Sequence, residues 1–424
     1  MSEDPILIAG GGIAGLTLAL TCHQLGVPVQ VFESTRELRP LGVGINVQPN
    51  AVRELIDLGL GDHLPKIGVA TQEYGFFTKH GKEIWNEPRG LEAGYSWPQY
   101  SVHRGELQLM LHDAVVDRLG SDAIQLGSRV TGYVNDGDSA RLQVEVNGEA
   151  TEVSGPLVVA ADGLHSAIRA QMVPDEGPPI WGGAILWRGC TRAKPFRTGA
   201  SMAIMGKPHI RFVTYPISDA DPDTGEALIN WIAETTFDPS HGWAREDWNR
   251  RADKADFIDN YRDWDVDWID PLDLIERTAE VFEYPMVDRD PLDSWTDGRV
   301  TLMGDAAHIM YPVGSNGASQ AIIDARKIGR GFLDHGVNPD AMAAFENEVR
   351  PASRRMILAG RGSGPDSVVT IVEERCGGEF DDINDVMPYD ERAALSDKYK
   401  KLAGFDIETL NARPPIIEPG SRLG

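Results

Sequence analysis

Residues 6–22 read ILIAGGGIAGLTLALTC, an apolar run that glycines interrupt near its middle. Residues 6–9 predict a short buried strand, and residues from about 14 to 25 predict a helix that Gly26 ends. Residues 27–33, VPVQVFE, predict a second strand. The chain therefore opens with a strand–turn–helix–strand unit, which predicts a parallel βαβ arrangement.

The turn of this unit has the spacing Gly10-x-Gly12-x-x-Gly15, with Ala14 inside it. The first glycine permits a tight turn, the second lets the backbone approach a pyrophosphate, and the third lets the helix pack on the strand. A pyrophosphate would lie at the N-terminus of the helix. Glu33 ends the second strand, where its carboxylate is placed to accept hydrogen bonds from an adenosine ribose. This context favours dinucleotide binding.

The overall composition excludes several classes of partner. With 40 basic and 65 acidic residues, the formal net charge is −25. This charge argues against binding to nucleic acid or to an anionic membrane surface. Three cysteines without a Cys-x-x-Cys spacing indicate neither a disulfide framework nor a metal site. Acidic residues precede the first apolar run and glycines break it, so we expect no membrane span and a cytoplasmic protein. We expect a monomer or a homodimer.

Two further segments combine a buried strand with a glycine turn. The first is AADGLHSAIR (160–169), and the second is GDAAHIMYPVGSNGASQAIIDA (304–325). In the second, Asp305 and His308 lie close enough to suggest a catalytic dyad. No nucleophile in a serine or cysteine turn accompanies them, so we interpret His308 as a scaffold residue.

The chain predicts an α/β protein with a Rossmann-like nucleotide-binding domain that a strand-rich insertion interrupts. We assign residues 1–78, 101–178 and 288–350 to the nucleotide-binding domain. Residues 79–100 and 179–287 form the predicted antiparallel substrate domain. Residues 351–424 are expected to form a helical C-terminal segment.

The three glycine motifs, in this order, resemble those of the single-component FAD-dependent aromatic hydroxylases. The resemblance implies the FAD-binding fold of the glutathione reductase type (GR2), with FAD as cofactor and NAD(P)H as a co-substrate that has no Rossmann site of its own. It implies a monooxygenase that hydroxylates an aromatic or N-heteroaromatic substrate with O2 through a flavin C4a-hydroperoxide. An acidic, phenazine-like substrate is the first expectation.

The resemblance also assigns roles to residues of this chain. Asp305 is expected to bind the ribityl chain of FAD, and the turn that Gly314 and Gly317 form is expected to receive the negative edge of the reduced flavin. Ser315 or Asn316 is expected to cap the helix that follows. The remaining residues expected to contact the cofactor are Gly44, Ile45, Arg104, Val130, Asp162 and Gly304. Arg36, Arg39 and Arg188 are candidates for guiding NAD(P)H.

The substrate is expected to contact the predicted strand in HIRFVTYPIS (209–218). Arg211 and Tyr215 lie on one face of that strand, because alternate residues share a face. Tyr215 is the candidate for proton chemistry, and Arg211 is the candidate partner of a substrate carboxylate. Tyr311 and Pro312 are expected to form the floor of the substrate pocket.

Three other functions remain open at this stage. A flavin-dependent epoxidase or a decarboxylative hydroxylase would use the same cofactor site. A non-oxygenating flavin oxidoreductase is a more distant alternative.

Overall fold

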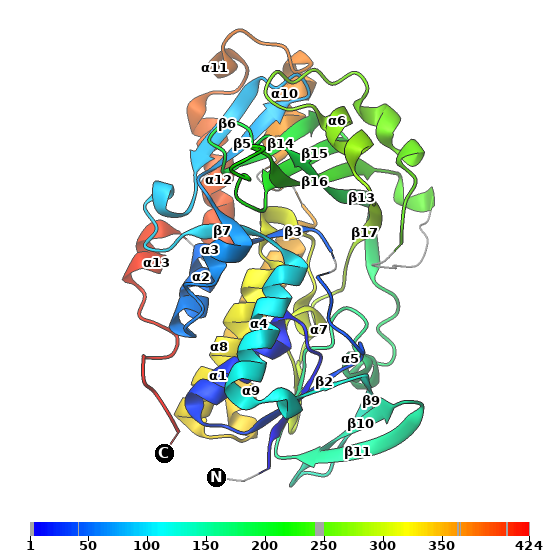
Figure 1. Ribbon diagram of the computed structural model, residues 1–424, viewed down its shortest axis with the longest axis vertical. Helices are drawn as coiled ribbons and strands as arrows, with labels where there is room; N and C mark the ends of the chain where they lie inside the picture. The colour runs from blue at the N-terminus through cyan, green and yellow to red at the C-terminus, as the bar shows by residue number, and fades with distance from the viewer. Residues whose placement is uncertain are drawn as a thin grey trace.

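The computed structural model describes residues 4–40, 42–241, 250–362, 364, 366–403 and 406–423. Residues 242–249 of the expected substrate domain lie outside this part of the chain. The protein has a nucleotide-binding domain below a second, strand-rich domain, with C-terminal helices along one side (Figure 1).

The N-terminal βαβ unit lies inside a six-stranded sheet with the order β18-β19-β12-β1-β2-β8. All neighbouring pairs in this sheet are parallel except β18 with β19. Its strands are β1 (Ile6–Ala9), β2 (Val29–Glu33), β8 (Ile124–Leu126), β12 (Val158–Ala160), β18 (Thr296–Asp297) and β19 (Val300–Leu302). The central strands are wholly apolar because both faces of the sheet are buried.

The helices of this domain pack around the sheet and on one another, and one of them is enclosed by its neighbours. They are α1 (Ile13–Leu25), α2 (Pro49–Asp57), α3 (Leu64–Ile67), α4 (Arg104–Leu119), α5 (Ala167–Met172), α7 (Asp305–His308), α8 (Gly317–His335) and α9 (Pro339–Gly360). Almost every residue of α1 is buried, since it packs against the sheet, α4 and α8. A helix that is apolar on all sides belongs in such an interior position.

Two small antiparallel sheets complete this domain. One contains β3 (Gly44–Val47), β7 (Gln99–His103) and β4 (Gly68–Thr71), and the other contains β9 (Ser128–Asn135), β10 (Ala140–Val146) and β11 (Glu149–Gly155).

The strand-rich domain is built on a seven-stranded sheet with the order β17-β13-β16-β15-β14-β5-β6. Its strands are β5 (Glu73–Thr78), β6 (Glu83–Pro88), β13 (Ile180–Ala193), β14 (Ser201–Lys207), β15 (Ile210–Pro216), β16 (Ala227–Thr236) and β17 (Phe282–Asp288). One face packs on the segment 250–281, which includes α6 (Pro271–Arg277), through an aromatic core that contains Phe212, Trp231 and Phe257. Helix α10 (Ser367–Cys376) packs on the other face.

Two of the expected boundaries differ from the structure. The expected boundary after residue 78 places β5 in the nucleotide-binding domain. In the structure β5 belongs to the substrate sheet, because it pairs in parallel with β14. The boundary at residue 350 falls inside α9, which continues through Pro351 to Gly360. A proline inside a helix removes one hydrogen bond, but packing of the helix can offset that cost.

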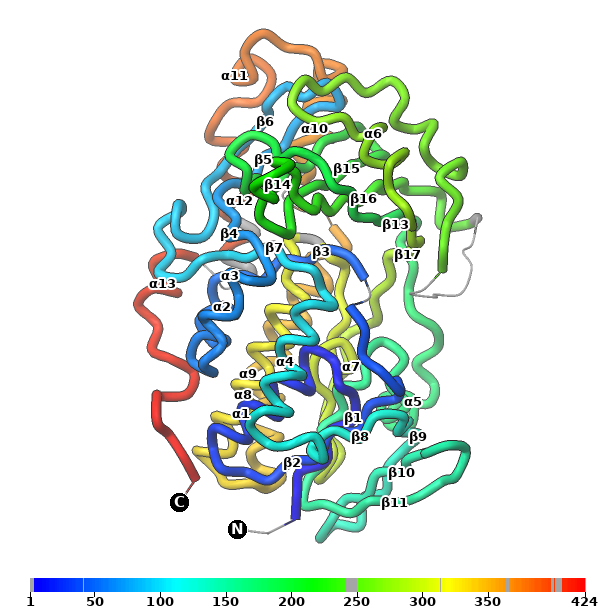
Figure 2. The backbone as a smooth tube through the Cα atoms, viewed as in Figure 1, coloured from blue at the N-terminus to red at the C-terminus, as the bar shows by residue number. Residues whose placement is uncertain are grey.

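The C-terminal segment is helical, as expected, and its last residues return to the N-terminal part of the chain. After α10 come α11 (Ile383–Val386), α12 (Tyr389–Ala403) and α13 (Ile407–Ala412). The chain then runs back along the nucleotide-binding domain (Figure 2). The Leu423 N–H donates a hydrogen bond to the Leu25 carbonyl oxygen at 3.1 Å, and Ile417 is fully buried. This last segment therefore packs on the nucleotide-binding domain beside the end of α1.

Candidate functional site

The first glycine turn has the geometry that a dinucleotide requires. Gly10 has φ 102°, and a Cβ on it would lie 2.4 Å from the Ala161 carbonyl oxygen. A Cβ on Gly15 would lie 2.0 Å from the Gly10 carbonyl oxygen, so only glycine allows this contact between helix and turn. A Cβ on Gly12, in contrast, would meet no described atom within 4 Å. The space in front of Gly12 is therefore open to a pyrophosphate.

Glu33 anchors this turn as well as facing the expected ribose site. Its Oε2 accepts a hydrogen bond from the Gly11 N–H at 2.8 Å, and its Oε1 accepts one from the Thr35 N–H at 2.8 Å. A carboxylate can accept about four hydrogen bonds, so acceptor capacity remains for a ribose hydroxyl.

Asp162 lies on the second glycine turn, directly after β12. Its Oδ2 accepts a hydrogen bond from the Ala167 N–H at 2.9 Å, while its buried Oδ1 has no partner among the described residues. Burial raises the pKa of this carboxyl. An unsatisfied buried oxygen is costly, so Asp162 is suited to a donor from a bound molecule.

The third motif meets the first at the N-terminus of α1. A Cβ on Gly304, which has φ 57°, would lie 3.1 Å from the Cβ of Ala14. The neighbouring Asp305 is accessible to solvent, yet burial raises its pKa, with the charges of His308 and Arg104 opposing that rise. The Asp305 carboxylate is therefore accessible to a ligand. Arg104 is exposed at the start of α4, and its N–H donates to the Val43 carbonyl oxygen at 3.0 Å.

His308 is buried and points toward Asp324 of α8. The distance between His308 Nε2 and Asp324 Oδ2 is 2.5 Å. Burial opposes a charge on the imidazole, but the Asp324 carboxylate outweighs it and raises the pKa of His308. Asp324 Oδ2 also accepts the Gly304 N–H at 3.0 Å. These bonds hold the turn in place, which agrees with a scaffold role for His308.

The N-terminus of α8 presents free N–H groups. Asn316 is the N-cap residue, but its side chain forms no capping hydrogen bond; its Nδ2 contacts the Met356 sulfur at 3.3 Å. The expectation of a side-chain cap from Asn316 is therefore not met. A Cβ on Gly317 would meet no described atom within 4 Å. Uncapped N–H groups and the helix dipole suit the anionic edge of a reduced flavin.

Strand β3 connects this helix to the substrate sheet. The Gln48 N–H, just after β3, donates to Ser319 Oγ at 2.9 Å, and Gln48 Nε2 donates to the Gly314 carbonyl oxygen at 3.3 Å. At the other end of β3, the Gly44 N–H donates to Asn230 Oδ1 at 2.7 Å. A Cβ on Gly44 would lie 2.7 Å from both Asn230 and Tyr215.

Tyr215 lies at this junction, buried and close to Arg188. Burial raises the pKa of its phenol to about 12, while the nearby Arg188 guanidinium opposes the rise. Arg188 also donates to the Gly44 carbonyl oxygen at 2.6 Å and lies 5.6 Å from the ring centre of Tyr284. Arg188, a candidate for guiding NAD(P)H, thus lies between the cofactor domain and the substrate sheet. Asn230 was not among the predicted site residues. Alternate residues of ALINWIAE (227–234) share a face, and the strand register places Asn230 and Glu234 on the face of Tyr215.

Arg211 does not lie free on this face. Its guanidinium donates hydrogen bonds to the Asp366 carboxylate and, at 3.2 Å, to Thr370 Oγ1. The expectation that Arg211 is available to a substrate carboxylate is therefore not met. The reason is that α10, from the far end of the chain, packs over this end of the sheet and supplies an acidic partner.

The remaining predicted residues lie at the edges of the site. Tyr311 is buried, with its hydroxyl against Gly182 of β13, and burial raises its pKa to about 12; Pro312 beside it is exposed. Ile45 and Val130 are partly buried against the core of the nucleotide-binding domain. Among the candidates for guiding NAD(P)H, Arg39 pairs with Glu37 at 2.6 Å on the surface.

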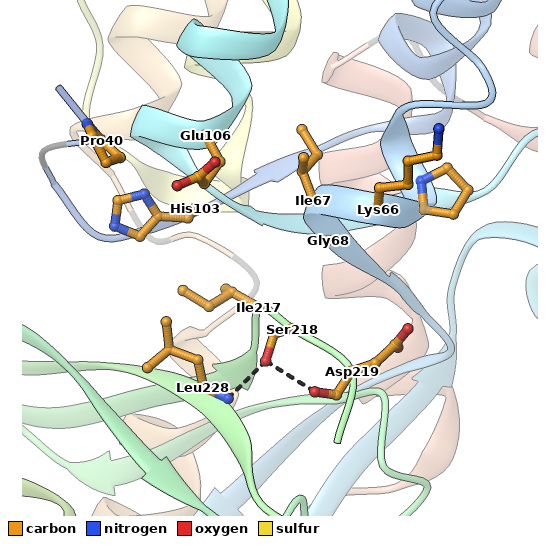
Figure 3. Close-up of a pocket in the computed structure, with 11 residues that line it drawn as sticks. Pro40, Lys66, Ile67, Gly68, His103, Glu106, Ile217, Ser218, Asp219 and Leu228 are labelled. Carbon is orange, nitrogen blue, oxygen red and sulfur yellow. Dashed lines mark hydrogen bonds between the residues drawn. The ribbon is translucent and has the colours of Figure 1, made fainter. Parts of the chain in front are cut away.

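A pocket of about 460 Å³ lies between the two domains, beyond the end of β15 (Figure 3). Pro40, His103 and Glu106 line one side, and Ile217, Ser218 and Leu228 line the opposite side. Lys66 and Asp219 complete its charged lining. Two carboxylates against one ammonium do not favour the phosphates of a dinucleotide, so this pocket is not where we place them.

Comparison with known proteins identifies the class. Residues 3–357 match the family model described as the FAD binding domain. The chain belongs to this family and, within it, to the single-component FAD-dependent aromatic hydroxylases. FAD is its cofactor, and the open space at Gly12, the accessible Asp305 and the uncapped α8 fit that cofactor.

Two curated relatives cover most of the chain. Phenazine 1,6-dicarboxylic acid hydroxylase PhzS of Lysobacter antibioticus is 42% identical over 85% of this chain and 90% of its own length. Aurachin C monooxygenase/isomerase of Stigmatella aurantiaca is 32% identical over 80% of this chain and 84% of its own.

Solved structures share the fold. HpxO of Klebsiella pneumoniae, complexed with FAD and uric acid, superposes with a TM-score of 0.75 at 23% identity, covering 98% of each chain. A salicylate hydroxylase substrate complex superposes with a TM-score of 0.73 at 21% identity, covering 98% of this chain and all of that one. In the described part of this chain, no helix is long and apolar enough to cross a membrane.

Proposed function

We propose that this flavoprotein monooxygenase hydroxylates a flat N-heteroaromatic acid, with O2 and NAD(P)H as co-substrates. The observation that carries the proposal is the position of Arg188. Its guanidinium lies on the substrate sheet, bonded to the carbonyl oxygen of Gly44 in the cofactor domain and close to Tyr215. Its buried Nε has no hydrogen-bond partner among the described residues.

Arg188 is the residue we assign to the substrate carboxylate. Arginine binds a carboxylate with parallel hydrogen bonds, which fixes the plane of an attached ring. The hydrogen bond to Gly44 and the contact with the Tyr284 ring hold its guanidinium in place before the substrate arrives. Beside it, Val213 and Ile232 are partly accessible and lie in register across β15 and β16. They form an apolar floor on which an aromatic ring can rest.

When bound, FAD would supply the redox chemistry, namely acceptance of a hydride and activation of O2. The protein's own part is to hold FAD, orient the ring and exclude water. Gly12, Asp305 and the N-terminus of α8 would hold the cofactor. Tyr215 is neutral near pH 7, and burial raises its pKa further, to about 12, so its hydroxyl can act as a hydrogen-bond donor. It positions Arg188 and can donate to an oxygen on the substrate.

A nicotinamide dinucleotide is the proposed reductant. The described chain holds one glycine turn with an acid at the end of the next strand, and FAD takes that site. A second nucleotide would therefore bind only transiently and deliver its hydride to the flavin.

A screen of aromatic acids tests this function. The purified holoenzyme should oxidise NADH or NADPH faster when a ring acid that it accepts is added, and the product should be heavier by one oxygen atom. A yellow protein whose NAD(P)H consumption no aromatic acid stimulates would contradict the proposal. The coenzyme preference follows from the same screen, run with each nucleotide.

A further inference from the structure

Glu234 lies on the same face of the substrate sheet as Arg188 and Tyr215, at the end farther from the cofactor domain. It is opposite Arg211 in register, as Asn230 is opposite Tyr215. Four residues along a strand separate the two ends, which corresponds to roughly 13 Å. Val213 and Ile232 lie between them, in one row with the backbone of Arg188, whose guanidinium reaches back to Gly44. The partly accessible strip of the sheet thus begins beside the buried Tyr215 and Asn230 and ends at Glu234, a length that suits a fused-ring substrate.

The Glu234 carboxylate lacks a hydrogen-bond donor in the described part of the chain. Its nearest cation is Arg211, whose NH1 lies 3.9 Å from Glu234 Oε1, too far for a hydrogen bond. Arg211 instead bonds Asp366 and Thr370. The Tyr261 hydroxyl, from the segment on the opposite face, donates to the backbone oxygens of residues 211 and 234 and not to the carboxylate.

A closely surrounded carboxylate without a donor is costly unless a ligand supplies one. The side chain of Glu234 keeps 17% of its surface accessible. Burial raises the pKa of Glu234 to about 6. The Arg211 guanidinium opposes this rise, and the Asp366 carboxylate adds to it. The charges that face it are therefore one cation, Arg211, and one further anion, Asp366. With Glu234 ionised, this end of the strip carries one net negative charge.

We infer that Glu234 determines specificity at the far end of the substrate, where it accepts a hydrogen bond from an N–H or O–H group and disfavours a second carboxylate. The inference rests on the proposed function, since it takes the first carboxylate to lie at Arg188. The strip then has a cationic end near the cofactor and an anionic end away from it. An aromatic monoacid with a hydrogen-bond donor on the ring far from its carboxylate fits both ends of the strip. An aromatic diacid fits only the cationic end.

Binding of two probes to the oxidised holoenzyme tests the inference without turnover. The probes are phenazine-1-carboxylate and phenazine-1,6-dicarboxylate, the latter being the diacid in the name of the Lysobacter antibioticus relative. Each dissociation constant is measured from the perturbation of the flavin absorbance. Wild type should prefer the monoacid at about pH 8, and protonation of Glu234 should weaken that preference at about pH 5.5.

The variant Glu234→Gln removes the charge and keeps the size of the side chain. At about pH 8 it should shift the ratio of the two dissociation constants toward the diacid by roughly tenfold. The ratio should also lose its dependence on pH. The matched control is Glu152→Gln on β11, where Glu152 pairs with Arg141 at 2.7 Å on the surface, and it should keep the wild-type ratio.

The outcomes separate the two proposals. If both acids bind to wild type and Glu234→Gln leaves their ratio unchanged while retaining FAD, the role of Glu234 is overturned and the proposed function stands. If wild type with full FAD binds neither acid, the proposed substrate class fails, and the role of Glu234 fails with it.

Discussion

The Gly44 N–H donates a hydrogen bond of 2.7 Å to Asn230 Oδ1, and this bond joins the two domains at the point where the cofactor strand meets the substrate sheet. Asn230 is fully buried, and its Nδ2 has no partner among the described residues. Arg188 bonds the carbonyl oxygen of the same glycine. Two side chains of the substrate sheet therefore bond the N–H and the carbonyl oxygen of Gly44 and hold the backbone of β3 in place. Gln48, just after β3, in turn donates to the Gly314 carbonyl oxygen.

Replacing Asn230 with alanine should loosen this junction. A buried N–H left without an acceptor costs about 1–3 kcal/mol, so the free energy of unfolding should fall by that amount. Hydrogen peroxide released per NAD(P)H should rise, because the misplaced β3 admits water. Asn86→Ala, which removes a hydrogen bond to Glu73 elsewhere on the same sheet, is the control. Equal peroxide release from both variants would show that Asn230 only stabilises the fold.

Gly12 and Gly15 should respond differently to alanine. The Cβ of Gly12→Ala enters open space, so the apoprotein should keep its stability while FAD affinity falls at least roughly tenfold, since the methyl group occupies the path of the pyrophosphate. The Cβ of Gly15→Ala would lie 2.0 Å from the Gly10 oxygen, so the apoprotein itself should be destabilised. Thermal unfolding of the apoproteins and FAD titration measure the two effects. Unchanged FAD affinity in Gly12→Ala would contradict our placement of the pyrophosphate.

Arg188→Lys should separate charge from geometry. Lysine keeps the positive charge but cannot form parallel hydrogen bonds with a carboxylate. We expect KM for the accepted acid to rise roughly tenfold or more, with FAD content unchanged. Steady-state kinetics with the acid and with its uncharged amide provide the measurement. A similar loss for acid and amide would contradict a carboxylate partner.

Tyr215→Phe should lower product formation more than NAD(P)H consumption. The variant keeps the packing against Gly44 but removes the hydroxyl beside Arg188. Product formed per NAD(P)H consumed is the readout, and Tyr133→Phe, which removes the hydroxyl that bonds Asp297 far from this site, is the control. Wild-type rate and coupling in Tyr215→Phe would remove Tyr215 from the site.

The buried His308–Asp324 pair should make stability depend on pH. The folded protein raises the pKa of His308, so the stabilisation is fully present below the ordinary histidine pKa of about 6.5. It is lost as the pH rises through the higher pKa of the folded state. The variant His308→Gln should flatten this dependence in urea unfolding series, while the exposed His63→Gln should retain it. A wild-type pH profile in His308→Gln would contradict the assignment.

The cofactor site could be predicted largely from local sequence. Gly10, Gly15 and Gly304 have backbone angles or contacts that exclude a side chain, and the motif spacing predicted these glycines, although the residues that Gly10 and Gly304 approach, Ala161 and Ala14, lie far along the chain. The expected elements around them are present, although their ends differ by a few residues. The extent of the substrate sheet was harder to predict, because β5 joins it by pairing with β14, far along the chain.

What the sequence by itself determined is therefore the fold class and the placement of the glycine turns, since backbone conformation depends on neighbouring residues. Only the tertiary structure decided how the polar side chains pair. Arg211 bonds Asp366, 155 residues away, and Gly44 bonds Asn230, 186 residues away. A strand shows which side chains share a face, but the partner of each charge depends on which distant segment packs there. For this reason Arg211 has its partner within the protein, and we propose Arg188 and Glu234 as the two ends of the substrate site.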